Sequence, residues 1–433
     1  MKFSAPLLLA LAFSANAIAA ADAPLGVDAG LAAAAREQRP LLLDFQAQWC
    51  YSCYFMATHV LTGAQWDDAV RRAHVLEVDG DSPDGARWME KLAIKALPSY
   101  VVLKPDGGEL GRIVGEQPRD KFYAALHKIL AGSDALDVLK TKAAGGSLEA
   151  AGDVLASYQA RDAFDDGLAW YAQLPASTRT AADHDARVAL WRERLRMQKA
   201  LRSEDRDACV ASARKVLASA VGCDRYYVLE GLIECSGKLP GGERKAVLQA
   251  QRPALDALLD RQVFVAAPAC ADQRSATLVA ADLAKAVGDA AAEKAVLDRA
   301  IAFVRAALRE DYARDRNLAD NLRVYLQRAG RMEEHDALLP KLIAAYPDDY
   351  VYAYRYGRSL LERDQPSRAL PFLEQAAQKT FGANRLYVAE LHAKALLALH
   401  RRADAEKVVA EALQQNGPWF PQAAAKLKAV LKS

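Results

Sequence analysis

The sequence predicts a chain of two parts, an α/β domain with a central mixed sheet flanked by helices and then an all-α domain of helical repeats. In the first 130 residues, short apolar runs alternate with helical segments and turn clusters, as in an α/β domain. From residue 148 onward no stretch has the pattern of a strand, and Ala/Leu-rich segments are separated by short turns. With 433 residues, the chain is also too long for one small domain.

The first 21 residues are expected to be a signal peptide. A positively charged start and the apolar run Pro6–Phe13 precede a small-residue cleavage site between positions 17 and 21. A membrane anchor is the alternative, but an anchor needs about 20 apolar residues. The apolar run is interrupted at Ser14 and Asn16, so we favour cleavage and export.

The rest of the chain is expected to comprise the α/β domain over 22–130, a linker over 131–147 and the helical domain over 148–433. Glycine and serine residues at both ends of the 131–147 segment indicate the linker. The charge is nearly balanced at +2, with 26% charged residues, so we expect neither a nucleic-acid partner nor a disordered acidic region. No segment after the leader is long and apolar enough to span a bilayer, so the mature chain should be soluble.

The stretch Leu41–Cys53 carries the chemistry. Its first five residues are apolar except for Asp44, which is typical of a buried strand. Cys50 stands where this strand gives way to a helix, and Cys53 follows one turn later, so a disulfide between them can close. A helix N-terminus favours the thiolate form of a cysteine. We therefore predict that Cys50 is the exposed attacking thiolate and that Cys53 is the resolving thiol.

Two other interpretations of the cysteine pair are open. A structural zinc site would need two more Cys or His ligands at metal-site spacing. His59 and His74 are isolated and the next cysteine is Cys209, so we expect no metal and no cofactor besides the redox-active disulfide. A purely structural disulfide is the second alternative, but such a bond is rare at a strand-to-helix junction behind a tryptophan.

Residues 30–130 resemble the thioredoxin fold, and within it the C-terminal periplasmic thioredoxin domain of the transmembrane disulfide reductase DsbD and similar secreted thioredoxin-like domains. The features that carry the resemblance are Asp44, the segment Trp49-Cys50-Tyr51-Ser52-Cys53, the strand Val75–Asp79, the tripeptide Leu97-Pro98-Ser99 and Gly115. The combination is specific, although each feature alone would be weak.

The resemblance assigns roles to four further residues. It implies that Pro98 is cis and faces the disulfide, and that Leu97 presents main-chain groups to an extended client segment. It also implies that Trp49 packs over the disulfide. Asp44 would lie buried beneath Cys53 with a raised pKa and would accept the proton of that thiol. The alternatives are a surface acid at Asp44 and an ordinary strand-opening proline at Pro98.

The resemblance implies a periplasmic thiol–disulfide oxidoreductase that reduces disulfide-containing client proteins. A membrane-embedded donor would return electrons to the Cys50–Cys53 pair. Two alternatives are open: an oxidase or isomerase that uses the same chemistry in another direction, and a redox-linked scaffold or chaperone-like binding module.

Near the C-terminus, small residues recur in a pattern that resembles degenerate tetratricopeptide repeats. Alanine pairs seven residues apart recur after 32 and 36 residues, close to the period of about 34 of such helix pairs. The residues concerned are Ala337 and Ala344, Ala369 and Ala376, Ala405 and Ala412, together with Gly357. A solenoid of this kind presents a concave surface suited to a partner. A generic Ala-rich bundle is the alternative.

The remaining cysteines all lie in the helical domain, and helix geometry selects one of three possible pairings. The expected helices are Asp205–Ala220, Asp224–Glu234 and Glu243–Arg261. Cys223 and Cys235 lie at opposite ends of one helix, roughly 18 Å apart, which is too far for a disulfide. Cys209 and Cys235 are equidistant in sequence from the turn at Gly222, so they should lie level on two antiparallel helices. The third helix runs back toward that turn, so Cys270, which follows it, should lie near Cys223. We predict the disulfides Cys209–Cys235 and Cys223–Cys270, and four free buried thiols are the alternative.

Overall fold

The computed structural model describes residues 26–132 and 135–432, so the expected signal peptide lies outside the described residues. The N-terminal part contains one four-stranded mixed sheet in the order β2-β1-β3-β4. Its strands are β1 (Leu41–Gln46), β2 (His74–Asp79), β3 (Ser99–Leu103) and β4 (Glu109–Val114). β1 runs parallel to β2 and antiparallel to β3, and β3 runs antiparallel to β4.

Helices cover both faces of this sheet. They are α1 (Val27–Glu37), α2 (Tyr51–Phe55), its π-helical continuation η1 (Met56–Val60), α3 (Gly63–Arg72), α4 (Pro83–Lys91) and α5 (Arg119–Leu130). α1 and α4 pack on one face, and η1, α3 and α5 pack on the other. The expected fold class is therefore observed, although α3 did not stand out in the sequence.

Successive side chains of β1 point to opposite faces of the sheet, and this decides which of them lies on the side of α2. Leu41, Leu43 and Phe45 belong to the apolar cluster that α1 and α4 complete. Leu42 belongs to the opposite cluster, which contains residues of η1, α3 and α5. Because successive side chains of a strand point to opposite faces, Asp44 shares the face of Leu42 and lies on the side of α2.

The rest of the described chain is helical. Its first helices are α6 (Leu136–Ala144), α7 (Leu148–Ala160), α8 (Phe164–Ala172), α9 (Ala176–His184), α10 (Ala186–Arg202), α11 (Arg206–Leu217), η2 (Gly222–Asp224), α12 (Arg225–Cys235), η3 (Ser236–Lys238), α13 (Gly241–Gln249), α14 (Arg252–Leu258) and η4 (Leu259–Val263). The later helices are α15 (Gln273–Ala286), α16 (Ala290–Leu308), α17 (Arg316–Arg328), α18 (Met332–Ala345), α19 (Val351–Glu362), α20 (Pro366–Ala377), α21 (Gly382–Ala398), α22 (Arg402–Asn416) and α23 (Pro421–Val430). Among the described helices, none is long and apolar enough to cross a bilayer.

Two sequence expectations about this region need correction. The segment 131–147 is not an extended linker, because it contains α6, whose Leu139 and Ala143 are buried in a cluster shared with α7 and α10. The single helix expected over 243–261 is divided into α13, α14 and η4. Pro253 at the start of α14 explains the break, since proline is tolerated in the first turn of a helix and not in its interior.

The C-terminal helices form a series of antiparallel pairs with the expected spacing. The first helices of three pairs begin at residues 316, 351 and 382, and their partners at 332, 366 and 402. The alanine pairs of α20 and α22 are buried, as expected, whereas Ala337 and Ala344 are exposed. In α18, Leu338 and Leu342 take the inward positions instead. A Cβ at Gly357 would lie 2.7 Å from Leu373 Cγ, so this glycine permits the close approach of α19 and α20.

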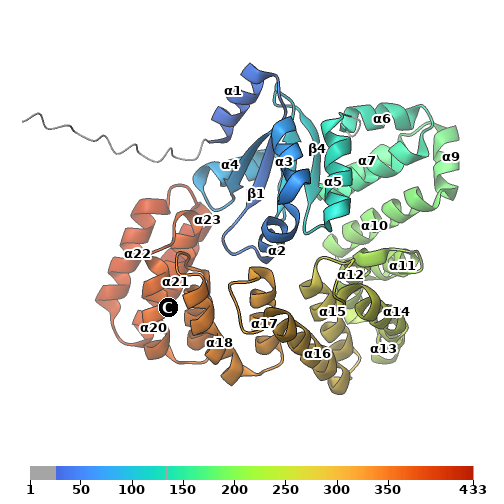
Figure 1. The fold of residues 1–433 in the computed structure, drawn as a ribbon. Coiled ribbons are helices and arrows are strands. Elements are labelled where there is room, and N and C mark those ends of the chain that lie inside the picture. The colour runs from blue at the N-terminus through green and yellow to red at the C-terminus, as the bar shows by residue number, and fades with distance from the viewer. Residues whose placement is uncertain (1–25, 133–134, 433) are drawn as a thin grey trace, which may run out of the picture.

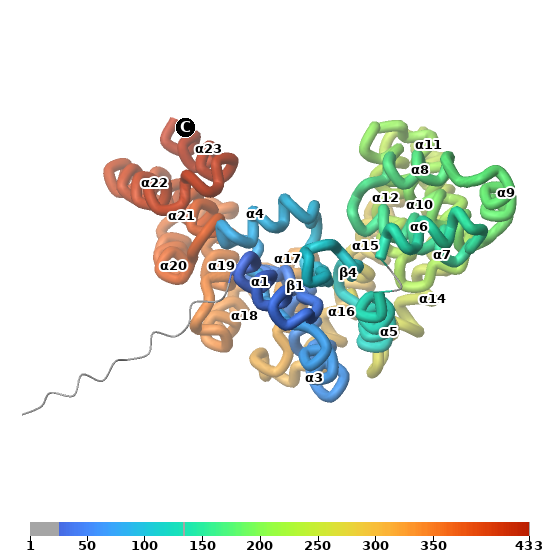
Figure 2. Tube along the Cα trace, turned by 90° about the horizontal axis from the view of Figure 1, so that it is seen from above, coloured from blue at the N-terminus to red at the C-terminus, as the bar shows by residue number. Residues whose placement is uncertain are grey.

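The helical region forms an arc that encloses the α/β domain (Figures 1 and 2). One end contacts β4, where Arg161 of α7 forms an ion pair of 2.5 Å with Glu109. The other end contacts the loop after β2, where the Ala383 N–H donates to the Asp81 carbonyl at 3.0 Å. Between them, α17 faces α2. The concave side expected to bind a partner therefore holds the chain's own α/β domain.

A buried ion cluster joins three helices of the arc. Asp320 of α17 is completely buried and forms ion pairs with Arg274 of α15 at 2.6 Å, with Arg323 at 2.8 Å and with Arg355 of α19. Burial alone would raise the pKa of Asp320, but the three guanidinium groups outweigh it and hold the pKa well below its ordinary value. Asp320 is therefore an anion at all physiological pH values.

The structure contains the two disulfides expected in the helical region. Cys209–Cys235 joins α11 to α12 with a Cα separation of 6.0 Å, and Cys223–Cys270 joins η2 to the segment before α15 with a Cα separation of 5.3 Å. Both separations lie within the reach of a disulfide. Each bond is expected to stabilise the folded chain by roughly 2–4 kcal/mol.

The Asp320 cluster yields a stability prediction. Asp320→Asn should lower the free energy of unfolding by about 3–5 kcal/mol at neutral pH, because it leaves buried guanidinium groups without their anion. Because the folded-state pKa of Asp320 is depressed, its contribution is present above the unfolded pKa and is lost as pH falls through the folded pKa.

Urea unfolding measures both effects, and Asp404→Asn is the matched control. Asp404 is half-exposed and pairs with Arg401 on the surface, so its loss should cost no more than about 1 kcal/mol. Equal losses in the two variants would contradict a stabilising role for the buried cluster.

Candidate active site

The cysteine pair lies at the start of α2. Cys50 is the N-cap residue, and its Sγ accepts a hydrogen bond from the Cys53 N–H at 3.1 Å. The two cysteines form a disulfide with a Cα separation of 5.2 Å. On reduction, the same backbone N–H and the positive end of the helix would stabilise a thiolate at Cys50.

Asp44 is buried in β1, the strand that leads to this pair, and is not a surface acid. It is 5% exposed, and its Oδ1 has no hydrogen-bond partner. Burial, followed by the charge of Glu77 on the neighbouring strand, raises the pKa of Asp44 to about 7. A carboxyl group with this pKa can accept and return a proton near neutral pH.

The loop before β3 forms the other wall of the site. The Leu97–Pro98 peptide bond is cis, and the Leu97 side chain packs against Cys50 and Cys53. The Pro98 carbonyl accepts a hydrogen bond from the Gly115 N–H at 2.9 Å, which ties this loop to the end of β4. The cis bond that the resemblance implied is therefore present, and Leu97 lies beside the cysteine pair.

Trp49 is anchored by its indole N–H, which donates to Asp81 Oδ2 at 2.8 Å. Its ring is 43% exposed and lines a cavity of about 500 Å³ between the α/β domain and α19 and α21, together with Tyr354 and Tyr387. Part of the tryptophan is thus available to a molecule that enters this cavity.

The exposure expected for Cys50 is wrong, because the residue is only 4% exposed. The helical arc covers it: Asn317 Nδ2 donates to the Tyr51 carbonyl at 2.9 Å, and Arg355 Nη2 donates to the Trp49 carbonyl at 3.0 Å. The guanidinium of Arg274 lies 3.6 Å from the centre of the Tyr51 ring. Two arginines of the Asp320 cluster therefore contact the redox motif itself.

Glu116 is a buried acid beside the motif that sequence reasoning did not identify. Neither of its carboxyl oxygens has a hydrogen-bond partner. Burial and then Asp272 raise the pKa of Glu116 well above its ordinary value, while Ser52 and Arg274 oppose the shift. This shift favours the neutral form of the Glu116 carboxyl group. The only sequence signal was an acid directly after Gly115, at the end of β4.

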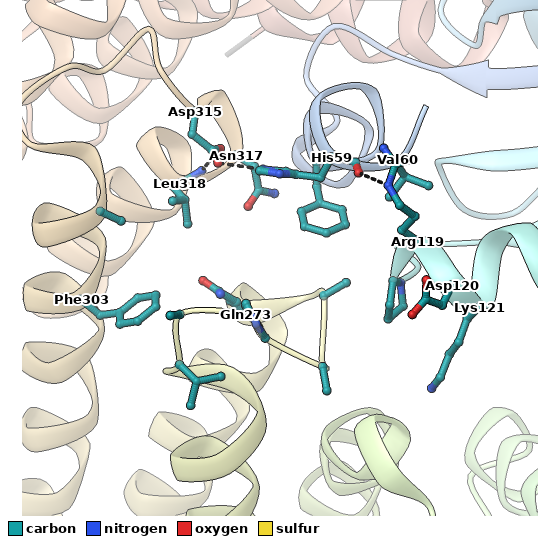
Figure 3. Close-up of a pocket in the computed structure, with 18 residues that line it drawn as sticks. His59, Val60, Arg119, Asp120, Lys121, Gln273, Phe303, Asp315, Asn317 and Leu318 are labelled. Atoms are coloured by element: carbon teal, nitrogen blue, oxygen red, sulfur yellow. Dashed lines mark hydrogen bonds and ion pairs between the residues drawn. The ribbon is translucent and has the colours of Figure 1, made fainter. Parts of the chain in front are cut away.

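Two further cavities flank the motif between the two domains. The cavity in Figure 3 has a volume of about 630 Å³ and is lined by side chains of both domains, among them Phe55 and Phe303. At its rim, His59 Nε2 lies 2.8 Å from Asp315 Oδ2, so His59 forms an inter-domain contact. A second cavity of about 640 Å³ lies beside the loop of Leu97.

Comparisons with known proteins agree with this site. The sequence pattern of the family described as thioredoxin-like matches residues 22–105. The thiol:disulfide interchange protein DsbD of Ralstonia nicotianae is 29% identical over 112 residues, which cover 25% of this chain and 18% of that protein. This chain spans only about a fifth of the DsbD proteins it matches. A crystal structure of a tetratricopeptide repeat protein from Parabacteroides merdae has a TM-score of 0.38 at 12% identity, covering 65% of this chain and 98% of that one.

A further relative matches over most of its own length. The H-type thioredoxin of Chlamydomonas reinhardtii is 33% identical over 107 residues, which cover 25% of this chain and 89% of that protein. The α/β domain, its Cys50–Cys53 pair and its cis-Pro98 match that relationship. The chain belongs to the thioredoxin family.

Proposed function

We propose that this protein is a periplasmic thiol–disulfide oxidoreductase that reduces disulfides in client proteins. The observation that carries the proposal is the Cys50–Cys53 pair at a helix N-terminus, directly after a strand that carries a buried carboxyl group with a pKa of about 7. Relatives named thiol:disulfide interchange proteins support the reaction class. The DsbD resemblance and the expected signal peptide support the compartment.

The reaction follows from the site. The Cys50 thiolate attacks a sulfur of the client disulfide, which forms a mixed disulfide and releases one client thiolate. Asp44 accepts the proton of Cys53, and the Cys53 thiolate then attacks Cys50. This step releases the second client sulfur and leaves Cys50–Cys53 oxidised. A membrane-embedded donor would return two electrons to the pair.

The cis-proline loop would hold the client. Leu97 lies against the cysteine pair and precedes β3, so its backbone could pair with an extended client segment. The half-exposed ring of Trp49 borders the site on the other side. Client access would then run between the α/β domain and the arc.

The coverage of Cys50 favours a second candidate, a redox-linked scaffold in which the disulfide fixes a conformation. Insulin reduction with dithiothreitol, and then with a protein reductant, separates the two functions. Turnover faster than that of the reductant alone supports the reductase. No turnover with either reductant would favour the scaffold.

The two cysteines should differ in their variants. Cys50→Ser should abolish disulfide exchange, while Cys53→Ser should leave an enzyme that stalls as a mixed disulfide, because Cys50 is the residue at the helix N-terminus. Non-reducing gels and mass spectrometry of the trapped species provide the measurement. Equal trapping by both variants would refute this division of roles.

Asp44→Asn should slow the resolving step at neutral pH. Asp44 acts as a base only above its pKa of about 7, and a cysteine thiol ionises unaided near pH 8.5. The defect should therefore be largest around pH 7–8 and should shrink above roughly pH 9. Single-turnover decay of the mixed disulfide across this range measures it, and a pH-independent ratio of rates would contradict the role.

The same variant should be more stable than the wild type at alkaline pH. Because the folded-state pKa of Asp44 is raised, its burial does not lower the free energy of unfolding below its unfolded pKa. Between about pH 4 and about pH 7 the ionisation of Asp44 increasingly lowers the free energy of unfolding, and above about pH 7 the full loss is reached. A shift from 3.8 to about 7 corresponds to at most ~4 kcal/mol. Urea unfolding at pH 4 and pH 8 should show the gain only at pH 8.

A further inference from the structure

The cavity beside the loop of Leu97 has a disulfide on its far wall. Tyr51, Ser52 and Leu97 line the side that belongs to the α/β domain. Cys223 and Tyr227 line the opposite side, which belongs to the helical arc. A cysteine of the arc, Cys223, therefore lines the same cavity as the two residues between Cys50 and Cys53.

The two disulfides of the arc differ in access. Cys209 and Cys235 are both completely buried in the helical core. Cys223 is partly exposed and borders the cavity, while its partner Cys270 is completely buried. An attacking thiolate must reach one sulfur of a disulfide, so Cys223 Sγ is the accessible target and Cys270 the leaving group.

The segment that carries Cys270 is in contact with the redox motif. Cys270 precedes α15, whose Arg274 stacks on the Tyr51 ring. Ser275 Oγ lies 3.5 Å from the Tyr51 hydroxyl. Asp272, the N-cap of α15, accepts a hydrogen bond from the Tyr227 hydroxyl at 2.8 Å. The start of α15 thus connects the disulfide to Tyr51, one of the two residues between Cys50 and Cys53.

The surroundings of the disulfide can also accommodate its reduced form. Gln262 Oε1 lies 3.9 Å from Cys223 Sγ and 3.6 Å from Cys270 Sγ, and the Ala269 carbonyl oxygen lies 3.5 Å from Cys223 Sγ. A thiol donates a weak hydrogen bond, whereas a disulfide sulfur has no proton to donate. These acceptors would therefore stabilise the dithiol and not the disulfide.

We propose that Cys223–Cys270 is a second redox-active disulfide, which exchanges electrons with Cys50–Cys53 within one chain. The proposal rests on the proposed function in one respect: Cys50 must be a reactive thiol. The arc then acts as a resident redox partner of the α/β domain and not only as its cover.

The exchange is balanced in sulfur, electrons and protons. The Cys50 thiolate attacks Cys223 Sγ, the Cys223–Cys270 bond breaks, and Cys270 leaves as a thiolate that takes up a proton. Cys53 loses its proton and attacks Cys50, which frees Cys223 as a thiolate that is protonated in turn. Two electrons pass from one cysteine pair to the other. The sulfurs must come into contact, which requires the α/β domain to shift against the arc.

The first test follows each disulfide of the full-length oxidised protein during reduction by dithiothreitol. Samples are quenched with N-ethylmaleimide, and mass spectrometry reads every cysteine. Cys223–Cys270 should be reduced more than about fivefold faster in the wild type than in Cys50→Ser, because Cys50 relays the electrons. Cys209–Cys235 is the internal control and should react equally in both proteins. A smaller ratio at Cys223–Cys270 would overturn the proposal.

The second test traps the contact itself. The double variant Cys53→Ala/Cys270→Ala leaves Cys50 and Cys223 as free thiols, and mild oxidation with diamide in dilute solution should join them. Cys53→Ala/Cys235→Ala is the matched control, with Cys50 and Cys209 free, and should give no Cys50–Cys209 bond, because Cys209 is completely buried. A missing Cys50–Cys223 bond in the first variant, or a Cys50–Cys209 bond that forms equally well in the control, would overturn the proposal. Circular dichroism verifies folding, and the first test does not depend on either double variant.

Insulin reduction separates this proposal from the proposed function. If the wild type reduces insulin and Cys223–Cys270 does not respond to Cys50, the resident exchange fails and the reductase stands. If Cys223–Cys270 responds to Cys50 and insulin is not turned over, the exchange stands and the client-reductase function fails.

Discussion

The arrangement of the molecule depends on one buried anion, Asp320. An unpaired carboxylate in a protein interior is very costly, and Asp320 is instead paired with three arginines. Two of these arginines extend to the redox motif: Arg274 stacks on Tyr51, and Arg355 donates to the Trp49 carbonyl. The ion cluster that joins α15, α17 and α19 therefore also contacts the redox motif across the interface between the arc and the α/β domain.

Two buried aspartates, Asp44 and Asp320, have opposite pKa shifts because their surroundings differ. Asp44 and Asp320 are both withdrawn from water, which by itself raises a carboxyl pKa. Burial and then the charge of Glu77 on the neighbouring strand raise the pKa of Asp44 to about 7, so this carboxyl group can exchange a proton near neutral pH. Asp320 meets three cations, so it stays ionised and serves as a fixed charge.

The features predicted from sequence depend on local spacing. The strand with Asp44, the cysteine at the helix N-terminus and the pairing of the arc's cysteines all follow from periodicities of two and 3.6 residues. The coverage of Cys50 could not be predicted, because Asn317 and Tyr51 are 266 residues apart and Arg355 and Trp49 are 306 apart. The residue pattern within a single segment cannot predict contacts between residues so far apart in the sequence. The prediction that Ala337 and Ala344 of α18 are buried was wrong for the same reason, because the helices packed against α18 determine which of its faces is buried.

Because the α/β domain lies inside the arc, different parts of the chain determine the reactivity of the cysteine pair and the access of other molecules to it. In the proposed reaction, the helix N-terminus and Asp44 set the chemistry of the cysteine pair, and both belong to the α/β domain. Access to that pair is set by α15, α17 and α19, which belong to the arc. Thiol–disulfide exchange needs direct approach to a sulfur atom, so its rate depends on access as well as on thiolate content. A change in the arc can therefore alter which disulfides react while the thiol chemistry stays the same.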